Sequence, residues 1–92
     1  MIRAKIHVTL KKGILDPQGK TIHQALENLG IENISDVYVG KLIEINFTNV
    51  SENEARLLCE KACKKLLANP VIEDYKIELE TQAIEEEKTY LV

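Results

Sequence analysis

Residues 2–10 read IRAKIHVTL, and this stretch decides the fold. Apolar residues take the even positions from Ile2 to Leu10, whereas polar residues take the odd positions. The polar residues are Arg3, Lys5, His7 and Thr9. Strict alternation predicts a β-strand with one face in the core and the other face toward water.

A helix is expected soon after this strand. Asp16 and Pro17 form a pair typical of a helix N-cap followed by the first helical position. Apolar residues then recur at helical spacing, and Gly30 is expected to end the helix. These apolar residues are Ile22, Ala25, Leu26 and Leu29.

Residues 36–47 form a second extended stretch that admits two interpretations. Gly40 and Lys41 interrupt it, either as a bulge in one bent strand or as the turn of a tight hairpin. The alternation of apolar residues from Val37 to Phe47 keeps one parity throughout, which favours the bent strand.

The second helix has the clearest start in the sequence, because Ser51 and Glu54 form a capping box. Its predicted buried stripe consists of Ala55, Leu58, Cys59, Ala62 and Leu66. Asn69 and Pro70 end it. A last strand is expected over residues 71–79, with Val71, Tyr75, Ile77 and Leu79 on one face.

This order of elements predicts an α+β domain, β-α-β-(β)-α-β, whose antiparallel sheet carries two helices on one face. Residues 1–80 form the single domain, and residues 81–92 form an acidic tail. The tail contains a run of three glutamates and ends in apolar residues. It is therefore either a solvated tail or a strand that orders on a neighbour.

Charged residues are unevenly distributed along the chain. Basic residues predominate in residues 1–20, and acidic residues predominate in residues 71–92. If the first and last strands are neighbours, basic side chains of residues 3–5 face acidic side chains of residues 78–80. Opposite charges on neighbouring strands attract, which explains the asymmetry without a ligand.

The composition of this 92-residue chain argues against several function classes. A net charge of −3 is a poor match for nucleic acid, and three tyrosines with one phenylalanine make a weak stacking platform for RNA. No apolar run approaches the about 18 residues of a transmembrane helix, so no membrane span is expected. The alternating N-terminus is unlike a secretory signal, which makes the cytoplasm the expected compartment.

Residues that carry chemistry are few. Cys59 and Cys63 share one apolar pattern and lack further ligands at metal-binding spacing, so we expect buried, reduced thiols and no metal site. His7 and His23 have no nucleophile and orienting group in a triad pattern, so no catalytic residue is expected. The lysines of residues 11–12 precede a helix and either hold an anion or lie in a solvated loop.

Three stretches resemble the PurS family, the small subunit of phosphoribosylformylglycinamidine (FGAM) synthase. They are residues 8–20 (VTLKKGILDPQGK), residues 39–45 (VGKLIEI) and residues 66–75 (LLANPVIEDY). Their order and spacing match the family, and the resemblance covers the chain from about residue 3 to residue 80. The tail after Thr81 departs from it.

The resemblance implies a non-catalytic assembly subunit in de novo purine biosynthesis, with a fold related to the ferredoxin-like one. The implied partners are a large synthetase subunit, which uses ATP and Mg, and a glutaminase subunit, which supplies ammonia. The resemblance also implies a homodimer or a tetramer. No cofactor is expected in this chain itself.

Partner contacts are expected on two segments that project from strand or helix ends. The candidate partner-binding residues are Lys11, Lys12, Asp16, Gln18, Gly19, Gly40 and Lys41. Two rival functions remain, a small-molecule-binding regulatory module of ferredoxin-like fold and a small hydrolase such as an acylphosphatase. The hydrolase needs an arginine in a phosphate-cradling loop, and neither Arg3 nor Arg56 lies in one.

Overall fold

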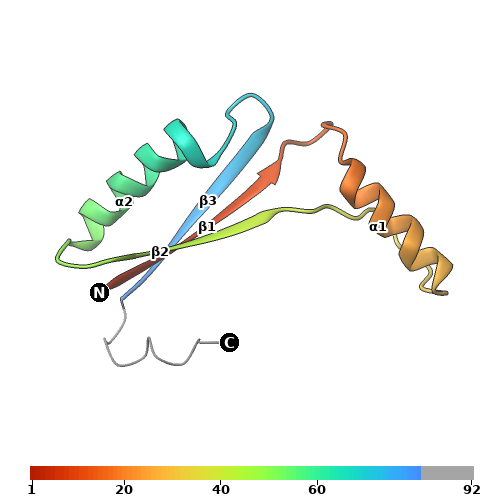
Figure 1. Ribbon diagram of the computed structural model, residues 1–92, viewed down its shortest axis with the longest axis horizontal. Helices are drawn as coiled ribbons and strands as arrows, with labels where there is room; N and C mark the ends of the chain where they lie inside the picture. The colour runs from red at the N-terminus through yellow and green to blue at the C-terminus, as the bar shows by residue number, and fades with distance from the viewer. Residues whose placement is uncertain (82–92) are drawn as a thin grey trace.

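The computed structural model describes residues 1–81 (Figure 1). Along the chain lie β1 (Ile2–Leu10), α1 (Pro17–Asn28), β2 (Lys41–Phe47), α2 (Glu52–Ala62), a π-helical turn (Cys63–Leu67) and β3 (Glu73–Thr81). None of the helices in this part of the chain is long and apolar enough to cross a membrane. The predicted tail, residues 81–92, lies outside the described residues except for Thr81.

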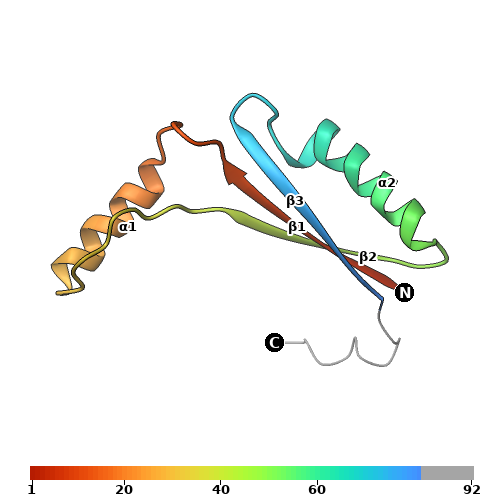
Figure 2. The same ribbon diagram turned by 180° about the vertical axis from the view of Figure 1, so that it is seen from behind.

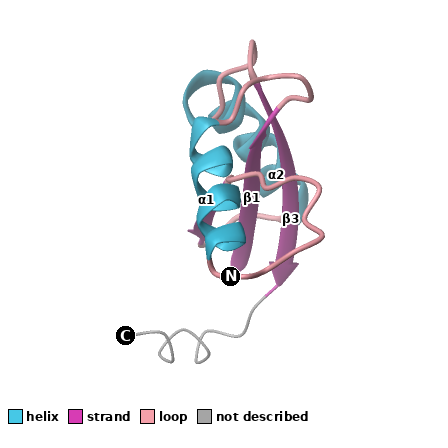
Figure 3. Cartoon of the chain, turned by 90° about the vertical axis from the view of Figure 1, so that its right-hand side faces the viewer, coloured by secondary structure: helices cyan, strands magenta, loops and turns pink. Residues whose placement is uncertain are grey.

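β1 is the central strand of a sheet with the order β2-β1-β3, and both neighbours run antiparallel to it. β1 and β3 lie side by side (Figure 3), so the condition under which the charge asymmetry needs no ligand is met. Lys5 lies opposite Glu78, and Arg3 lies opposite Glu80. Lys5 Nζ lies 3.3 Å from Glu80 Oε2, and His7 Nε2 lies 3.0 Å from Glu78 Oε1. The charge asymmetry of the sequence thus becomes a set of pairs across two strands.

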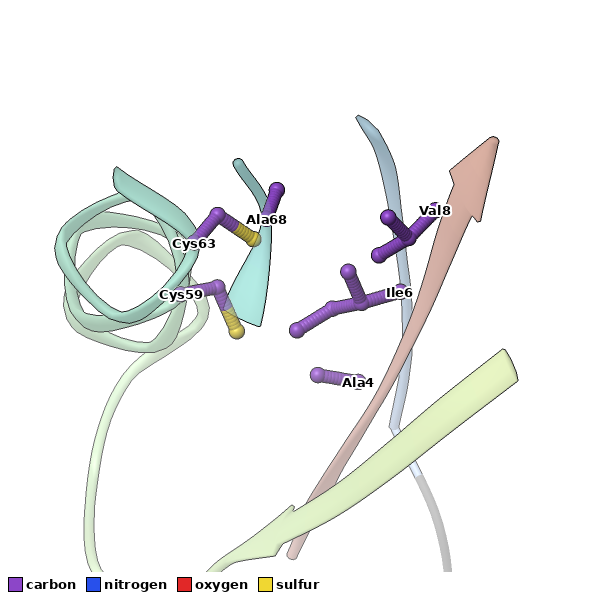
Figure 4. Packing of buried hydrophobic residues seen from close by; sticks show 6 residues of the cluster. All are labelled: Ala4, Ile6, Val8, Cys59, Cys63 and Ala68. Carbon is purple, nitrogen blue, oxygen red and sulfur yellow. The ribbon is translucent and has the colours of Figure 1, made fainter. Parts of the chain in front are cut away.

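The hydrophobic core lies between the sheet and α2 (Figure 4). Ala4, Ile6 and Val8 of β1 and Cys59 and Cys63 of the helical segment are each at most 1% exposed. Both cysteines are free, and burial raises the pKa of each thiol. The prediction of buried, unpaired core cysteines is confirmed.

The predicted buried stripe of α2 is partly wrong. Leu58 is 44% exposed and Leu66 is 79% exposed, whereas Cys63 is fully buried. Ala55, Cys59 and Cys63 recur every four residues, and the π-helical turn begins at Cys63. The prediction extended the α-helical period of about 3.6 residues through this wider turn, where it does not hold. Leu66 was therefore assigned to the wrong face.

Both helices begin where the sequence predicts. Ser51 Oγ accepts the N–H of Glu54 at 3.1 Å, and the Glu54 carboxylate accepts the N–H of Ser51 at 2.9 Å. Asp16 is the N-cap of α1, with Pro17 as its first residue. Gly30 has a φ of +89° just beyond α1, a conformation that glycine adopts without strain, so α1 ends as expected.

Residues 31–40, called the arm below, connect α1 to β2 and correct the prediction for residues 36–47. Neither the long bent strand nor the hairpin is observed, because β2 begins only at Lys41 and the arm pairs with no strand among the described residues. Val39 donates its backbone N–H to the Asp16 carboxylate, so this N–H is not available to a ladder with β1. The arm instead runs back along α1 (Figures 1 and 2).

The predicted α+β class, with an antiparallel sheet and two helices, is confirmed, but the two helices are placed differently. α2 packs against β1 and β3, whereas α1 lies beyond the end of the sheet (Figure 1). Ile22 is 39% exposed and Leu29 is 75% exposed, although both belong to the apolar side of α1. Periodicity identifies an apolar face, but it does not identify the surface that covers that face.

Candidate functional site

Four of the seven candidate residues line one cavity of about 450 Å³ at the end of the sheet. Asp16 and Gln18 come from the start of α1, and Gly40 and Lys41 come from the end of the arm and the start of β2. We call the surface formed by these four residues the junction. The two segments that the sequence singled out separately therefore meet in one place.

Asp16 connects two parts of the junction. One carboxylate oxygen accepts the N–H of Gly19 at 2.8 Å, and the other accepts the N–H of Val39 at 2.8 Å. The bond from Gly19, then that from Val39, holds the pKa of Asp16 below its ordinary value of 3.8, because both stabilise the carboxylate. Only 8% of Asp16 is exposed. Both of its oxygens are thus engaged by this chain's own backbone.

Gly19 and Gly40 allow backbone segments to approach one another closely. A Cβ at Gly19 would collide with the backbone oxygen of Val37 in the arm. A Cβ at Gly40 would lie 2.8 Å from the backbone oxygen of Val8 in β1. Both glycines therefore pack the chain against itself, and neither offers a side chain to a partner.

The polar candidates differ in how far the chain itself engages them. Lys11 Nζ donates a hydrogen bond of 2.7 Å to Asp74 on β3, and Lys41 Nζ lies 4.0 Å from a glutamate of β3. Lys12 and Gln18 are exposed, and neither side chain has a hydrogen bond or ion pair within residues 1–81. These two side chains are therefore available to a binding partner.

The contacts between α1 and the arm are the feature that sequence reasoning missed. A second cavity, of about 610 Å³, lies between α1, the loop before it and arm residues 35–38. His23 Nε2 lies at this cavity, 3.4 Å from Glu27 Oε2, and Tyr38 is 71% exposed beside it. The one signal in the sequence was Gly19, since glycine weakens a helix unless another segment approaches there.

Both histidines of the described residues lie next to a glutamate side chain. His7 pairs with Glu78 on the polar face of the sheet, and His23 pairs with Glu27 along α1. Among residues 1–81, no group of three or more His, Cys, Asp and Glu side chains could hold a metal ion.

Comparisons with known proteins agree with one another. Residues 3–81 match the family model described as PurS, phosphoribosylformylglycinamidine (FGAM) synthase. The chain is 45% identical over 80 residues to the phosphoribosylformylglycinamidine synthase subunit PurS of Methanocaldococcus jannaschii, an alignment that covers 87% of this chain and 96% of the relative.

Solved structures are similar as well. The crystal structure of Methanocaldococcus jannaschii PurS matches with a TM-score of 0.81 and 43% identity, over 90% of this chain and all of that one. A chain in the structure of PurLQS from Thermotoga maritima matches with a TM-score of 0.78 and 28% identity, over 86% of this chain and 96% of that one. The resemblance seen in the three sequence stretches is confirmed, and the chain belongs to the PurS family of phosphoribosylformylglycinamidine synthase.

Proposed function

We propose that the chain is a subunit of phosphoribosylformylglycinamidine synthase in purine biosynthesis, and that it assembles the complex without a catalytic centre of its own. The match to the family over residues 3–81 carries this proposal. The similarity to a chain of PurLQS from Thermotoga maritima supports the assembly role. A cytoplasmic location is part of the same proposal, because soluble metabolites feed such a pathway.

The partners in this proposal are a large synthetase subunit, which uses ATP and Mg, and a glutaminase subunit, which releases ammonia. Ammonia made at one site must reach the other before bulk water takes it up. Holding two enzymes in a fixed relative orientation raises the effective concentration of the transferred molecule and encloses its path. A small rigid domain with exposed polar loops suits this role.

The candidate residues divide into two roles under this proposal. Lys12, Gln18 and Lys41 are exposed and present polar groups at or near the junction, so they contact a partner directly. Asp16 and the two glycines are engaged by the chain's own backbone and act by shaping the surface. Lys11 is paired with Asp74 on β3 and is only partly engaged by the chain itself, so it combines both roles.

A homodimer completes the fold in this proposal. α2 packs against β1 and β3, so the apolar side chains of β2 on the same face, Ile43, Ile45 and Phe47, are only partly buried. The apolar side of α1 is also exposed in the single chain. Two apolar surfaces that stay partly exposed among residues 1–81 are well suited to meet those of a second copy.

The test of the function compares two nitrogen donors. The purified chain is combined with its synthetase and glutaminase subunits, and amidine formation is measured with glutamine and with free ammonia. Omitting the chain should abolish most of the glutamine-driven reaction and leave the ammonia-driven one nearly unchanged, since free ammonia bypasses transfer between sites. Equal loss of both reactions would refute the assembly role.

The direct contacts have their own test. Replacing Lys12 and Gln18 together by alanine should raise the concentration of the chain needed for half-maximal glutamine-driven activity. The matched control replaces Lys64 and Lys65, two exposed lysines of the π-helical turn that do not line the junction cavity, and should have no such effect. Equal behaviour of the two double variants would remove Lys12 and Gln18 from the interface.

A further inference from the structure

The position of α1 needs a physical cause, because packing on the sheet does not supply one. α1 lies beyond the end of the sheet and has few contacts with any strand or with α2. Two connections hold it: the loop from β1 and the arm, whose residues pair with no strand in the described chain. Whatever fixes the arm to the start of α1 therefore fixes the direction in which α1 leaves the sheet.

Asp16 makes that connection. Its carboxylate accepts the N–H of Gly19 at the start of α1 and the N–H of Val39, 23 positions away in the arm, both at 2.8 Å. The absence of a side chain at Gly19 lets the Val37 backbone oxygen approach the helix. A hydrogen bond to a buried charged group is among the stronger ones in proteins.

The two backbone N–H groups are the main partners of Asp16, because no charged side chain that lines the neighbouring cavities pairs with it within residues 1–81. On the side of α1 and the arm, the groups that line the same cavity are Lys20, His23, Glu27 and Asp36. On the side of the sheet they are Lys41 and Glu73. None of these six forms an ion pair with Asp16 within residues 1–81.

We infer that Asp16 is a positioning residue, a latch whose carboxylate ties the arm to the start of α1 and so presents α1 in one fixed orientation. Asp16 thus acts on assembly through α1 and not through its own contact with a partner. The consequence for assembly rests on the proposed function, whereas the latch itself is a property of the isolated chain.

The variant Asp16→Asn separates the two hydrogen bonds. Asparagine is as good an N-cap as aspartate, so its oxygen keeps the bond from Gly19, but its amide nitrogen cannot accept a bond from Val39. Amide hydrogen exchange should therefore speed up at Val39 by about tenfold or more, as expected for losing a hydrogen bond to a charged group. Exchange at Gly19 and at Ile6 in β1 should change little.

Two further variants complete the experiment. Gly19→Ala keeps the charge of Asp16, but the added Cβ would collide with the Val37 backbone oxygen and lie 2.8 Å from the Asp16 oxygen that accepts the Val39 N–H. It should therefore force the arm away from α1 and also speed up exchange at Val39. Asp36→Asn, which neutralises an exposed carboxylate of the same arm, is the matched control and should leave Val39 protected. If Ile6 also loses protection in Asp16→Asn, the chain has unfolded globally, and Gly19→Ala decides instead.

Unchanged exchange at Val39 in Asp16→Asn, with a folded core, overturns the latch whatever the complex does. The same holds if Gly19→Ala leaves Val39 protected. Faster exchange at Val39 supports the latch. If the glutamine-driven reaction then stays at its wild-type level in Asp16→Asn, the latch stands, and its part in assembly is overturned without affecting the proposed function of the chain.

Discussion

The hydroxyl of Tyr75 on β3 donates a hydrogen bond of 2.6 Å to the carboxylate of Glu60 on α2. This bond ties the helix to the sheet beside the core cysteines. It raises the pKa of Tyr75 from its ordinary 10.0 to about 12, because ionisation of the phenol would remove the donor and place two negative charges together.

This pKa shift predicts a loss of stability in alkali. A pKa raised on folding gives stabilisation that is fully present below about pH 10 and is lost as the pH rises toward about 12. The free energy of unfolding, measured by urea titration, should fall more steeply over this range for the wild type than for Tyr75→Phe. Parallel pH curves for the two proteins would show that the bond does not form in solution.

Asp16 predicts the opposite pH dependence. Its pKa is lowered on folding, so its contribution is fully present above its ordinary value of 3.8 and is lost as the pH falls through the lower, folded value. The difference in unfolding free energy between the wild type and Asp16→Asn should be largest at neutral pH and should shrink in acid. A difference that stays constant from neutral pH to about pH 2 would contradict this assignment.

Cys59 and Cys63 act as core side chains. Both are fully buried against Ala4, Ile6 and Val8 of β1 (Figure 4). Replacing both by alanine should lower the free energy of unfolding by roughly 1–3 kcal/mol, since the lost volume leaves cavities. The control on the same helix is Leu57→Ala, which trims a side chain that is 71% exposed and should cost much less. Stoichiometric zinc that disappears with the two thiols would instead make them ligands.

The elements that the sequence predicted well are those set by local chemistry. The alternation of residues 2–10 predicted β1, and the Ser51–Glu54 box predicted the start of α2. Each of these predictions depends only on residues that are close together in the sequence. The charge pattern was compatible with the pairing of β1 with β3 but did not predict it. Asp16 was also recognised correctly as a helix cap.

The features that escaped prediction depend on contacts between distant residues. The second bond of Asp16, to Val39, and the approach of Val37 to Gly19 have no local pattern, so the arm was interpreted as a strand or hairpin. Four of the candidate residues do lie together at one end of the sheet, because loops next to strand ends are recognisable, but their role in partner binding stays a prediction. Which of them are exposed and which are engaged internally follows only from the tertiary structure.

The exposed apolar side of α1 yields the last prediction, on the proposed homodimer. Ile22 is 39% exposed in the single chain, and a second copy would cover it. Ile22→Asp should then weaken the dimer by at least about a hundredfold in Kd, because an unpaired carboxylate in an apolar interface costs roughly 3–5 kcal/mol. Gln24→Asp adds the same charge to an exposed polar position of α1 and should leave the dimer intact. Sedimentation of both variants, with circular dichroism to verify that α1 still forms, separates the outcomes: a dimer that survives Ile22→Asp must use a surface other than the apolar side of α1.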